Sequence, residues 1–263
     1  DIQPAMTGSG FVSRCLRAIE RWVLEKSSLL VTTSPGFVRN YFQPVQNFQG
    51  ATFLLENKVY PSIALRPLLG EKPLVHDGSP WVVGCFGALR CRRSLEIMRQ
   101  VAGQLKGKVH FVLRGYAAGT ISDEFARLIE GAEGVSFEGP YRYPDDLAGI
   151  YAAVDFNWCF DESDPTGNSA WLLPNRIYEG GCFNVPALGA KETETGAWIE
   201  GNGCGWTIAE PLAENLAAFL RELTVRQWQA IAVRCAEVPA DRLRGESDYQ
   251  AWSDRLEACA VDE

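Results

Sequence analysis

The chain has 263 residues, 46% hydrophobic and 22% charged, so it is long and apolar enough to bury one large core or two smaller ones. Its net charge of −8, without any run of Lys and Arg, argues against a nucleic-acid partner, which would need a concentrated basic face. No apolar run reaches the ~20 residues of a membrane span, and the first ten residues lack the basic start and apolar core of a signal peptide.

The cysteines point to a reducing compartment. They are spread through the chain without a Cys-x-x-Cys pair, and we predict reduced thiols in the core of a cytosolic protein. They are Cys15, Cys85, Cys91, Cys159, Cys182, Cys204, Cys235 and Cys259. The histidines, His76 and His110, are far apart, so we expect neither a His-based metal site nor a Ser-His-Asp triad.

Along the chain, short apolar runs alternate with longer amphipathic stretches, a pattern typical of a parallel sheet with crossover helices. The predicted strands are Leu29–Thr33, Thr52–Leu55, Trp81–Gly87, Val109–Arg114, Val135–Glu138, Val154–Cys159, Val185–Leu188 and Gly205–Ile208. The predicted helices are Phe11–Lys26, Ser94–Leu105, Ser122–Glu130, Pro144–Ala153, Ala170–Cys182 and Pro211–Leu223, with more helix in the last forty residues.

These elements predict an α/β fold, a Rossmann-like parallel sheet with helices on both faces, in residues 81–223. Residues 61–80 are rich in Pro and Gly and are interpreted as a linker. Residues 1–60 hold too few strands to bury the sheet they imply, so we expect part of a second α/β domain and a chain that is a fragment. Residues 224–263 are expected to form C-terminal helices that pack back toward that first domain.

Ligands of open parallel sheets bind beyond the carboxyl ends of the strands. The first loop at such an end runs from Gly87 through three arginines to Ser94, a candidate helix cap. Glycine allows close approach to the backbone, a helix N-terminus offers free N–H groups, and Arg90 and Arg93 supply forked donors for phosphate oxygens. The alternative interpretation is a surface turn with solvated arginines.

A second loop, residues 161–169, follows the strand that ends near Cys159. Its Gly-Asn-Ser end, with Asn168 and Ser169, suits a helix start that presents N–H groups to an oxyanion or phosphate. Its acidic half would repel a diphosphate, so we expect it to face solvent, a sugar or an acceptor. The alternative is a plain loop that ends in a helix N-cap.

A third segment carries Arg176 and Glu179, which are three residues apart and share one face of a helix. One interpretation is a helix ion pair worth a few tenths of a kcal/mol. The other is that the carboxylate accepts two ribose hydroxyls while the guanidinium holds a phosphate or the loop around it. We expect the helix to close at Asn184, a residue that tolerates the left-handed conformation.

The order of these motifs resembles the donor half of a GT-B glycosyltransferase, closest to the group 1, or family 4, enzymes of cell-surface polysaccharide synthesis. The resemblance covers about residues 81–208. Its motifs are the Gly-rich basic turn, the strand that ends in Gly115, Phe137-Glu138-Gly139-Pro140, Pro174-Asn175-Arg176-Ile177-Tyr178-Glu179 and the later Pro186. Residues 18–57 resemble the last strand and helices of such an enzyme's acceptor domain.

The resemblance implies that Glu179 binds the nucleotide ribose and that Arg93 neutralises the donor diphosphate. Arg90 would replace the arginine that usually follows the glycine, where this chain has Ala88. At two further positions the sequence differs from the family's usual motif, and these differences leave the donor sugar and the stereochemical outcome of the transfer open. Trp171 stands in place of the first Glu of the family's Glu pair, and Asn184 in place of the glycine before Pro.

The expected function is transfer of a sugar from a nucleotide-diphosphate sugar to a hydroxyl acceptor, either a saccharide or a lipid-linked one. The expected leaving-group stabilisers are Arg90 and Arg93, and the expected donor-binding residues are Gly87, Asn168, Ser169, Arg176 and Glu179. We expect no metal and no cofactor. The family's roles make residues 1–60 the end of the acceptor-side domain and residues 81–223 the donor-binding domain.

We expect a cytoplasmic enzyme that associates peripherally with the inner face of the membrane through its N-terminal domain. Two alternatives stay open at this stage: a non-catalytic nucleotide- or carbohydrate-binding module, and a sugar-nucleotide epimerase, whose catalytic acids and bases we do not find in the sequence. The donor sugar, the base and the acceptor are not fixed by these motifs.

Overall fold

The computed structural model describes residues 10–60, 80–118, 121 and 123–261. Its main unit is a six-stranded sheet in the order β5-β4-β3-β6-β7-β8, and every neighbouring pair is parallel. The strands are β3 (Trp81–Leu89), β4 (Val109–Ala117), β5 (Val135–Phe137), β6 (Phe156–Trp158), β7 (Ala187–Ala190) and β8 (Gly205–Ile208). This is the doubly wound order, in which the chain changes direction between β3 and β6. The predicted α/β class is confirmed.

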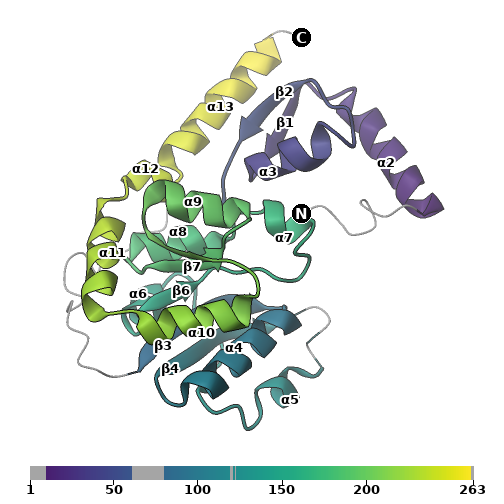
Figure 1. Cartoon of the computed structure of the whole chain (residues 1–263). Helices are drawn as coiled ribbons and strands as arrows, with labels where there is room; N and C mark the ends of the chain where they lie inside the picture. Colours follow the sequence, from purple (N-terminus) through teal and green to yellow (C-terminus); the bar gives the residue numbers. More distant parts are fainter. Residues whose placement is uncertain (1–9, 61–79, 119–120, 122, 262–263) are drawn as a thin grey trace.

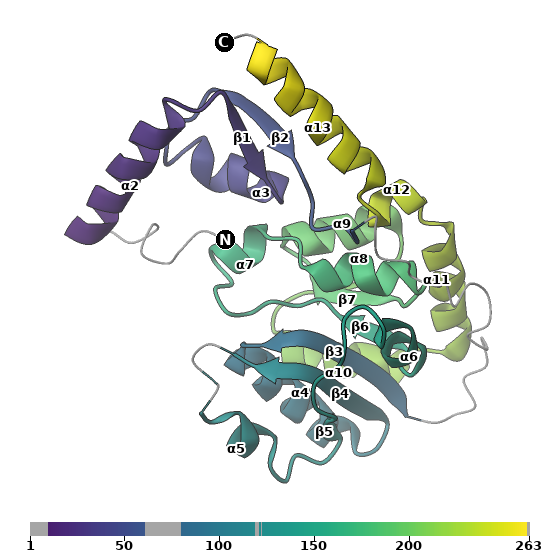
Figure 2. The ribbon, with the colours of Figure 1, turned by 180° about the vertical axis from the view of Figure 1, so that it is seen from behind.

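Helices cover both faces of this sheet (Figures 1 and 2). On one face α4 packs against α10, and on the other α6, α8 and α9 lie over the strands. The helices are α4 (Arg92–Leu105), α5 (Phe125–Ile129), α6 (Leu147–Ala152), α7 (Asn168–Trp171), α8 (Asn175–Cys182), α9 (Glu194–Asn202), α10 (Leu212–Glu222), α11 (Val225–Glu237), α12 (Ala240–Leu243) and α13 (Glu246–Val261).

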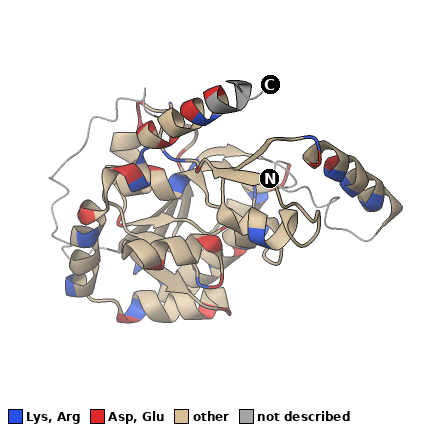
Figure 3. Ribbon diagram, turned by 90° about the horizontal axis from the view of Figure 1, so that it is seen from above, with Lys and Arg blue, Asp and Glu red and all other residues tan. Residues whose placement is uncertain are grey.

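The core explains why the apolar runs become strands. Phe111 in β4 and Phe156 in β6 are fully buried, and each stacks edge-on against a tryptophan, Trp158 and Trp81 respectively. Strands buried on both faces read as continuous apolar runs, which is why their positions were predictable. Acidic and basic residues are interspersed over the outer helices (Figure 3).

Residues 10–60 form a smaller region with a two-stranded parallel sheet, β1 (Leu29–Thr32) and β2 (Ala51–Leu54). Its helices are α2 (Phe11–Leu24), the single turn α3 (Pro35–Phe37) and the adjoining π-helical turn (Val38–Phe42). The predicted partial α/β region is therefore present. Among the described residues, no helix is both long enough and apolar enough to cross a membrane.

The C-terminal helices run back from α11 past α12 to α13, which rises toward the N-terminal region (Figure 1). Lys58 pairs with Asp248 at 2.6 Å, and the rings of Tyr60 and Tyr249 meet edge-on with centroids 5.0 Å apart. The predicted linker, residues 61–80, lies almost wholly outside the described residues, so the domain boundaries stay predictions.

Three details of the predicted elements were wrong. The helix predicted over residues 170–182 is two helices, because Pro174 interrupts it and serves as the N-cap of α8. The cap of α4 is Cys91 rather than Ser94: the Cys91 thiol accepts the Ser94 N–H at 3.3 Å. Helix α9 was not predicted at all.

The cysteine prediction holds for most of the described thiols, with Cys85, Cys159 and Cys204 buried. It was wrong for Cys15, which lies exposed on α2. The side chain of Cys259 lies outside the described residues.

Candidate active site

A cleft of about 640 Å³ opens at the carboxyl ends of β3 and β4. It lies beside the switch point between β3 and β6, where ligands of this sheet type bind. Its lining comes from the ends of these strands, the loops after β5 and β6, helix α8 with the residues before it, and two residues of the N-terminal region. The lining residues are Thr33, Asn57, Phe86, Gly87, Ala88, Arg90, Tyr116, Tyr141, Tyr143, Asp161, Leu172, Leu173, Pro174, Asn175, Arg176 and Glu179.

The end of β3 forms one wall because two glycines let the neighbouring strands approach there. Gly87 has φ +106° and pairs with Gly115 of β4, which has φ +131°. A Cβ at Gly115 would lie 1.9 Å from the Gly87 carbonyl oxygen, so a side chain cannot be accommodated. The open backbone of Gly87 therefore faces the cleft, and Arg90 follows directly after the strand.

Arg90 is held by the loop after β6. Its guanidinium pairs with the Asp161 carboxylate at 3.0 Å, and Asp161 also accepts from the Ser163 N–H at 3.0 Å and the Ser169 hydroxyl at 2.8 Å. Burial acts to raise the pKa of Asp161, but these hydrogen bonds outweigh it and hold the pKa below its usual range. Of the surroundings predicted for the acidic half of this loop, solvent does not apply to Asp161, whose side chain is only 5% exposed, while a sugar or an acceptor in the cleft that Asp161 lines stays a prediction.

Arg93 does not line the cleft. Its guanidinium contacts two carboxylates, Glu162 at 3.6 Å and Glu210 at the surface. Glu162 is buried as well, and burial raises its pKa to about 7 against the pull of Arg93. Arg93 is therefore not beside Arg90 as the sequence predicts, because the first turn of α4 carries it toward Glu162 and Glu210.

Asn168 and Ser169 also lie outside the cleft lining. Their N–H groups, predicted as a phosphate cradle, donate to Asp164: the Asn168 N–H to its carboxylate at 2.9 Å and the Ser169 N–H to its carbonyl at 3.1 Å. The Ser169 hydroxyl instead holds Asp161. In this structure the loop satisfies its own amides, and Ser169 reaches the cleft only through Asp161.

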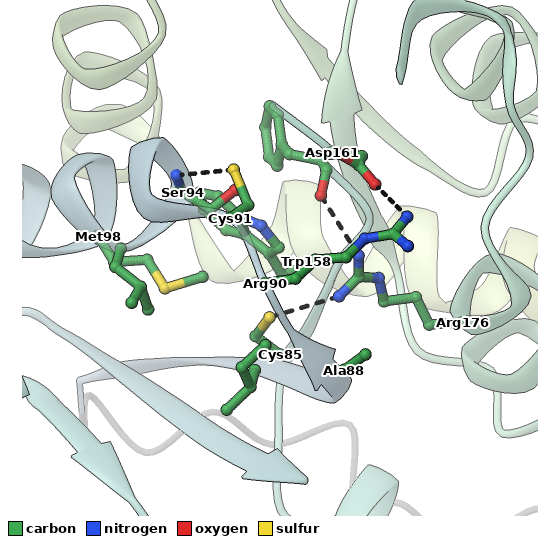
Figure 4. Close-up of a pocket in the computed structure, with 12 residues that line it drawn as sticks. Cys85, Ala88, Arg90, Cys91, Ser94, Met98, Trp158, Asp161 and Arg176 are labelled. Atoms are coloured by element: carbon green, nitrogen blue, oxygen red, sulfur yellow. Dashed lines mark hydrogen bonds and ion pairs between the residues drawn. The ribbon is translucent and has the colours of Figure 1, made fainter. Parts of the chain in front are cut away.

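Helix α8 supplies the opposite wall. The guanidinium of Arg176 contacts the Cys85 thiol and the Phe160 carbonyl, both at 3.5 Å, which holds it against the sheet (Figure 4). The contact to the carbonyl oxygen is at the long limit for a hydrogen bond, and neither partner is a carboxylate, so the guanidinium keeps most of its capacity for an anion.

Glu179 lies one turn further along α8 and is 9% exposed. The Tyr151 hydroxyl donates to its carboxylate at 3.3 Å, and burial raises the pKa of Glu179. Among the described residues Glu179 and Arg176 form no ion pair, so the helix ion-pair interpretation is wrong. A buried carboxylate at the edge of a cleft is instead suited to accept hydroxyl hydrogen bonds.

Three tyrosines on the far rim were not singled out from the sequence. Tyr116 ends β4, and Tyr141 and Tyr143 follow β5. Burial and the nearby charge of Glu179 raise the pKa values of Tyr141 and Tyr143 to about 12, so both are neutral donors. The signal was available, since Tyr116 lies at the end of β4 and Tyr141 and Tyr143 lie in the loop after the neighbouring strand β5, and the carboxyl ends of parallel strands meet at one sheet edge.

No metal site emerges from the part of the chain that the structure describes, where no group of three or more His, Cys, Asp or Glu side chains is arranged to hold an ion. The residues that the structure brings together are Gly87, Arg90, Arg176 and Glu179. They combine an open backbone, two guanidinium groups and a buried carboxylate around one cavity. This arrangement can bind an anion at one end and hydroxyl groups at the other.

No family model matches the chain. It is similar to the succinoglycan biosynthesis protein ExoL of Rhizobium meliloti, with 38% identity over 236 residues, which cover 89% of this chain and 59% of ExoL. The chain thus spans less than two thirds of that relative's length.

Solved structures share the fold at low sequence identity. Sucrose-phosphate synthase from Thermosynechococcus elongatus matches 98% of this chain and 65% of its own, with a TM-score of 0.70 and 14% identity. HepE of Anabaena, solved in complex with UDP, matches 96% and 70%, with a TM-score of 0.70 and 16% identity. A glycosyltransferase from Rickettsia africae matches 95% and 68%, with a TM-score of 0.65 and 14% identity. The predicted resemblance to GT-B glycosyltransferases is confirmed in the fold.

Proposed function

We propose that this chain binds the donor of a glycosyltransferase that transfers a sugar from a nucleotide-diphosphate sugar to a hydroxyl acceptor in cell-surface polysaccharide or glycolipid synthesis. The observation that carries the proposal is the cleft at the switch point, where Arg90, Arg176 and the buried Glu179 meet. The similarity to a succinoglycan biosynthesis protein and the UDP bound in a structural neighbour support it.

In this proposal the diphosphate lies against the backbone of Gly87, between the two guanidinium groups. Arg176 donates to a phosphate oxygen without losing an ion pair, and Arg90 shares its charge between the phosphate and Asp161. Glu179 accepts the ribose hydroxyls, and the tyrosine rim provides flat surfaces for the base. Arg93 and Ser169 act indirectly, through Glu162 and Asp161, and Asn168 helps to hold their loop.

The reaction breaks the bond between the anomeric carbon and the diphosphate oxygen while the acceptor hydroxyl oxygen forms a new bond to that carbon. Negative charge grows on the departing diphosphate, and preorganised donors next to it lower the barrier. The residue that removes the acceptor proton is not assigned in this chain.

We propose that the reaction needs neither metal nor cofactor, since two guanidinium groups already face the phosphate position. We also propose a saccharide or lipid-linked acceptor. A lipid-linked acceptor would bring the enzyme to the inner face of the membrane by peripheral association.

The test is a calorimetric titration of this chain with UDP, GDP and ADP in the presence of a chelator, repeated with the variant Glu179→Gln. At least one nucleotide should bind, and the variant should bind it about 1 to 3 kcal/mol more weakly because a charged acceptor of hydroxyl hydrogen bonds is lost. The matched control is Glu138→Gln, at an exposed position after β5 that does not line the cleft.

Absence of binding by every nucleotide to the folded chain would refute the donor-binding proposal. Normal binding by Glu179→Gln would refute the role of that carboxylate. A labelled nucleotide sugar, incubated with the full-length protein and a membrane extract that contains acceptors, separates an enzyme from a binding module, because only an enzyme moves the labelled sugar into the acceptor.

A further inference from the structure

Below the cleft lies a small chamber between the first turn of α4 and the ends of β3 and β6 (Figure 4). Its volume is about 20 Å³, enough for one water-sized atom and too small for a phosphate group. Its wall is continuous with that of the cleft, because Ala88, Arg90, Asp161 and Arg176 line both. The chamber is therefore a recess in the floor of the proposed donor site.

Two buried polar groups line this chamber without a hydrogen-bond partner among the described residues. They are the Ser94 hydroxyl, on a residue that is 6% exposed, and the indole N–H of Trp158, which is 1% exposed. An unsatisfied buried donor costs about 1 to 3 kcal/mol, so two of them at one cavity require an explanation. A ligand atom inside the chamber would satisfy both.

The charges around the chamber favour an acceptor atom. The indole N–H can only donate, and the guanidinium groups of Arg90 and Arg176 stand on the opposite side of the chamber (Figure 4). The positive end of the 14-residue helix α4 adds to this field. The one anion in the wall, Asp161, is already neutralised by Arg90 and by two further hydrogen bonds.

We propose that the chamber receives one phosphoryl oxygen of the donor diphosphate, and that Ser94 and Trp158 donate to it. This inference rests on the proposed function. It gives the phosphate two neutral hydrogen-bond donors besides the two guanidinium groups. The phosphorus atom stays in the cleft, between Arg90 and Arg176, while one of its oxygens enters the recess. Both contacts strengthen as charge grows on the departing phosphate, since hydrogen bonds to a charged acceptor are the stronger ones.

The first experiment follows the indole N–H of Trp158 directly by nitrogen-15 NMR. The resonance is assigned as the one missing from the variant Trp158→Phe, and the wild-type chain is titrated with inorganic pyrophosphate and, separately, with UDP. A new charged acceptor should shift this resonance in both titrations. Pyrophosphate probes the chamber even where no nucleotide binds.

The second experiment compares the affinities of UDP and uridine for Ser94→Ala and Trp158→Phe. Each variant should bind UDP roughly 10- to 150-fold more weakly, as expected for one hydrogen bond to a charged group, and should bind uridine unchanged. The matched control is Trp198→Phe, which also removes a buried indole N–H that has no hydrogen-bond partner in the described part of the chain, but lies in α9, outside both cavities.

The outcomes separate this inference from the proposed function. If UDP binds and neither variant nor the Trp158 resonance responds, the chamber proposal fails and the donor site stands. If pyrophosphate shifts the resonance and no nucleotide binds, the chamber is an oxyanion site and the proposed function fails. Equal losses for UDP and uridine, or an equal loss in Trp198→Phe, would mean that the side chains act through packing, which overturns the proposal.

Discussion

Phe111 in the six-stranded sheet is fully buried, whereas Phe11 and Trp22 on α2 of the N-terminal region are 81% and 59% exposed. The sheet unit closes its core between two layers of helices, while in the N-terminal region one face of α2 is left uncovered by the residues that the structure describes. The two walls of the cleft therefore belong to regions that differ in how completely their apolar side chains are buried. Gly87, Arg90 and Glu179 stand on the closed core, and Thr33 and Asn57 stand on the open region.

The largest expected effect tests this difference in burial. Phe111→Ala should lower the free energy of unfolding by about 3 to 5 kcal/mol, because it leaves a cavity in a closed core. Trp22→Ser should change it by less than about 0.5 kcal/mol, because an exposed side chain loses few contacts on replacement. Urea denaturation measures the free energy of unfolding of both variants and of the wild type. A large loss in Trp22→Ser would mean that α2 is covered in solution.

The sequence predicts most strands of the six-stranded sheet correctly and predicts its helices less well. A strand such as Phe156–Trp158, buried at every position, was found because burial on both faces demands apolar residues. Helix α9 was missed because Ala197, Trp198 and Ile199 are consecutive and form no apolar stripe at helical spacing.

In the site, the sequence identified Arg90, Arg176 and Glu179, which do line one cleft. It could not show that Asp161 would turn inward onto Arg90, because these residues are 71 positions apart and meet only when β3 and β6 pair. The Cys91 cap was equally hidden, since cysteine is not among the usual capping residues. The local sequence pattern shows at which strand end a residue lies. Which residue it contacts there depends on which strands pair in the folded sheet.

A second prediction compares the half-buried carboxylate of Glu20 in the N-terminal region with the buried carboxylate of Glu162 in the sheet unit. In the N-terminal region Glu20 accepts hydrogen bonds from Tyr41, at 2.5 Å, and from Gln46, whereas one oxygen of the buried Glu162 has no hydrogen-bond partner among the described residues. Burial raises the pKa of Glu162 from about 4.5 to about 7, so folding favours its protonated form. Its contribution to stability is present below about pH 4.5 and is lost as the pH rises to about 7.

Glu162→Gln should therefore be more stable than the wild type by about 1 to 3 kcal/mol at pH 8, with the gain vanishing near pH 4. Thermal or urea unfolding across this pH range measures the difference. Glu138→Gln removes one negative charge at an exposed position and controls for net charge. A gain that is independent of pH would contradict the assignment to Glu162.

The smallest expected effect concerns the contact between the two regions. The Ser34 hydroxyl donates to the Trp171 carbonyl, and Arg39 pairs with Glu194 at the start of α9. A Cβ on Gly36 would lie 2.7 Å from the same Trp171 carbonyl oxygen, so the backbones of α3 and α7 are in close contact. The ion pair contributes least, because the Arg39 side chain is 56% exposed and its charge is screened by water and salt.

Arg39→Ala should lower the free energy of unfolding by less than about 1 kcal/mol, and this small loss should disappear in high salt. Hydrogen exchange locates the effect better than global unfolding does: protection should fall in β1 and β2 and stay unchanged in β3 and β4, since regions of one protein open with their own free energies. Ser34→Ala removes the buried hydrogen bond instead and should give the same pattern without the salt dependence. If either variant lowered protection in β3 as well, the two regions would unfold as one unit, and the N-terminal wall of the cleft would be as firmly held as the sheet.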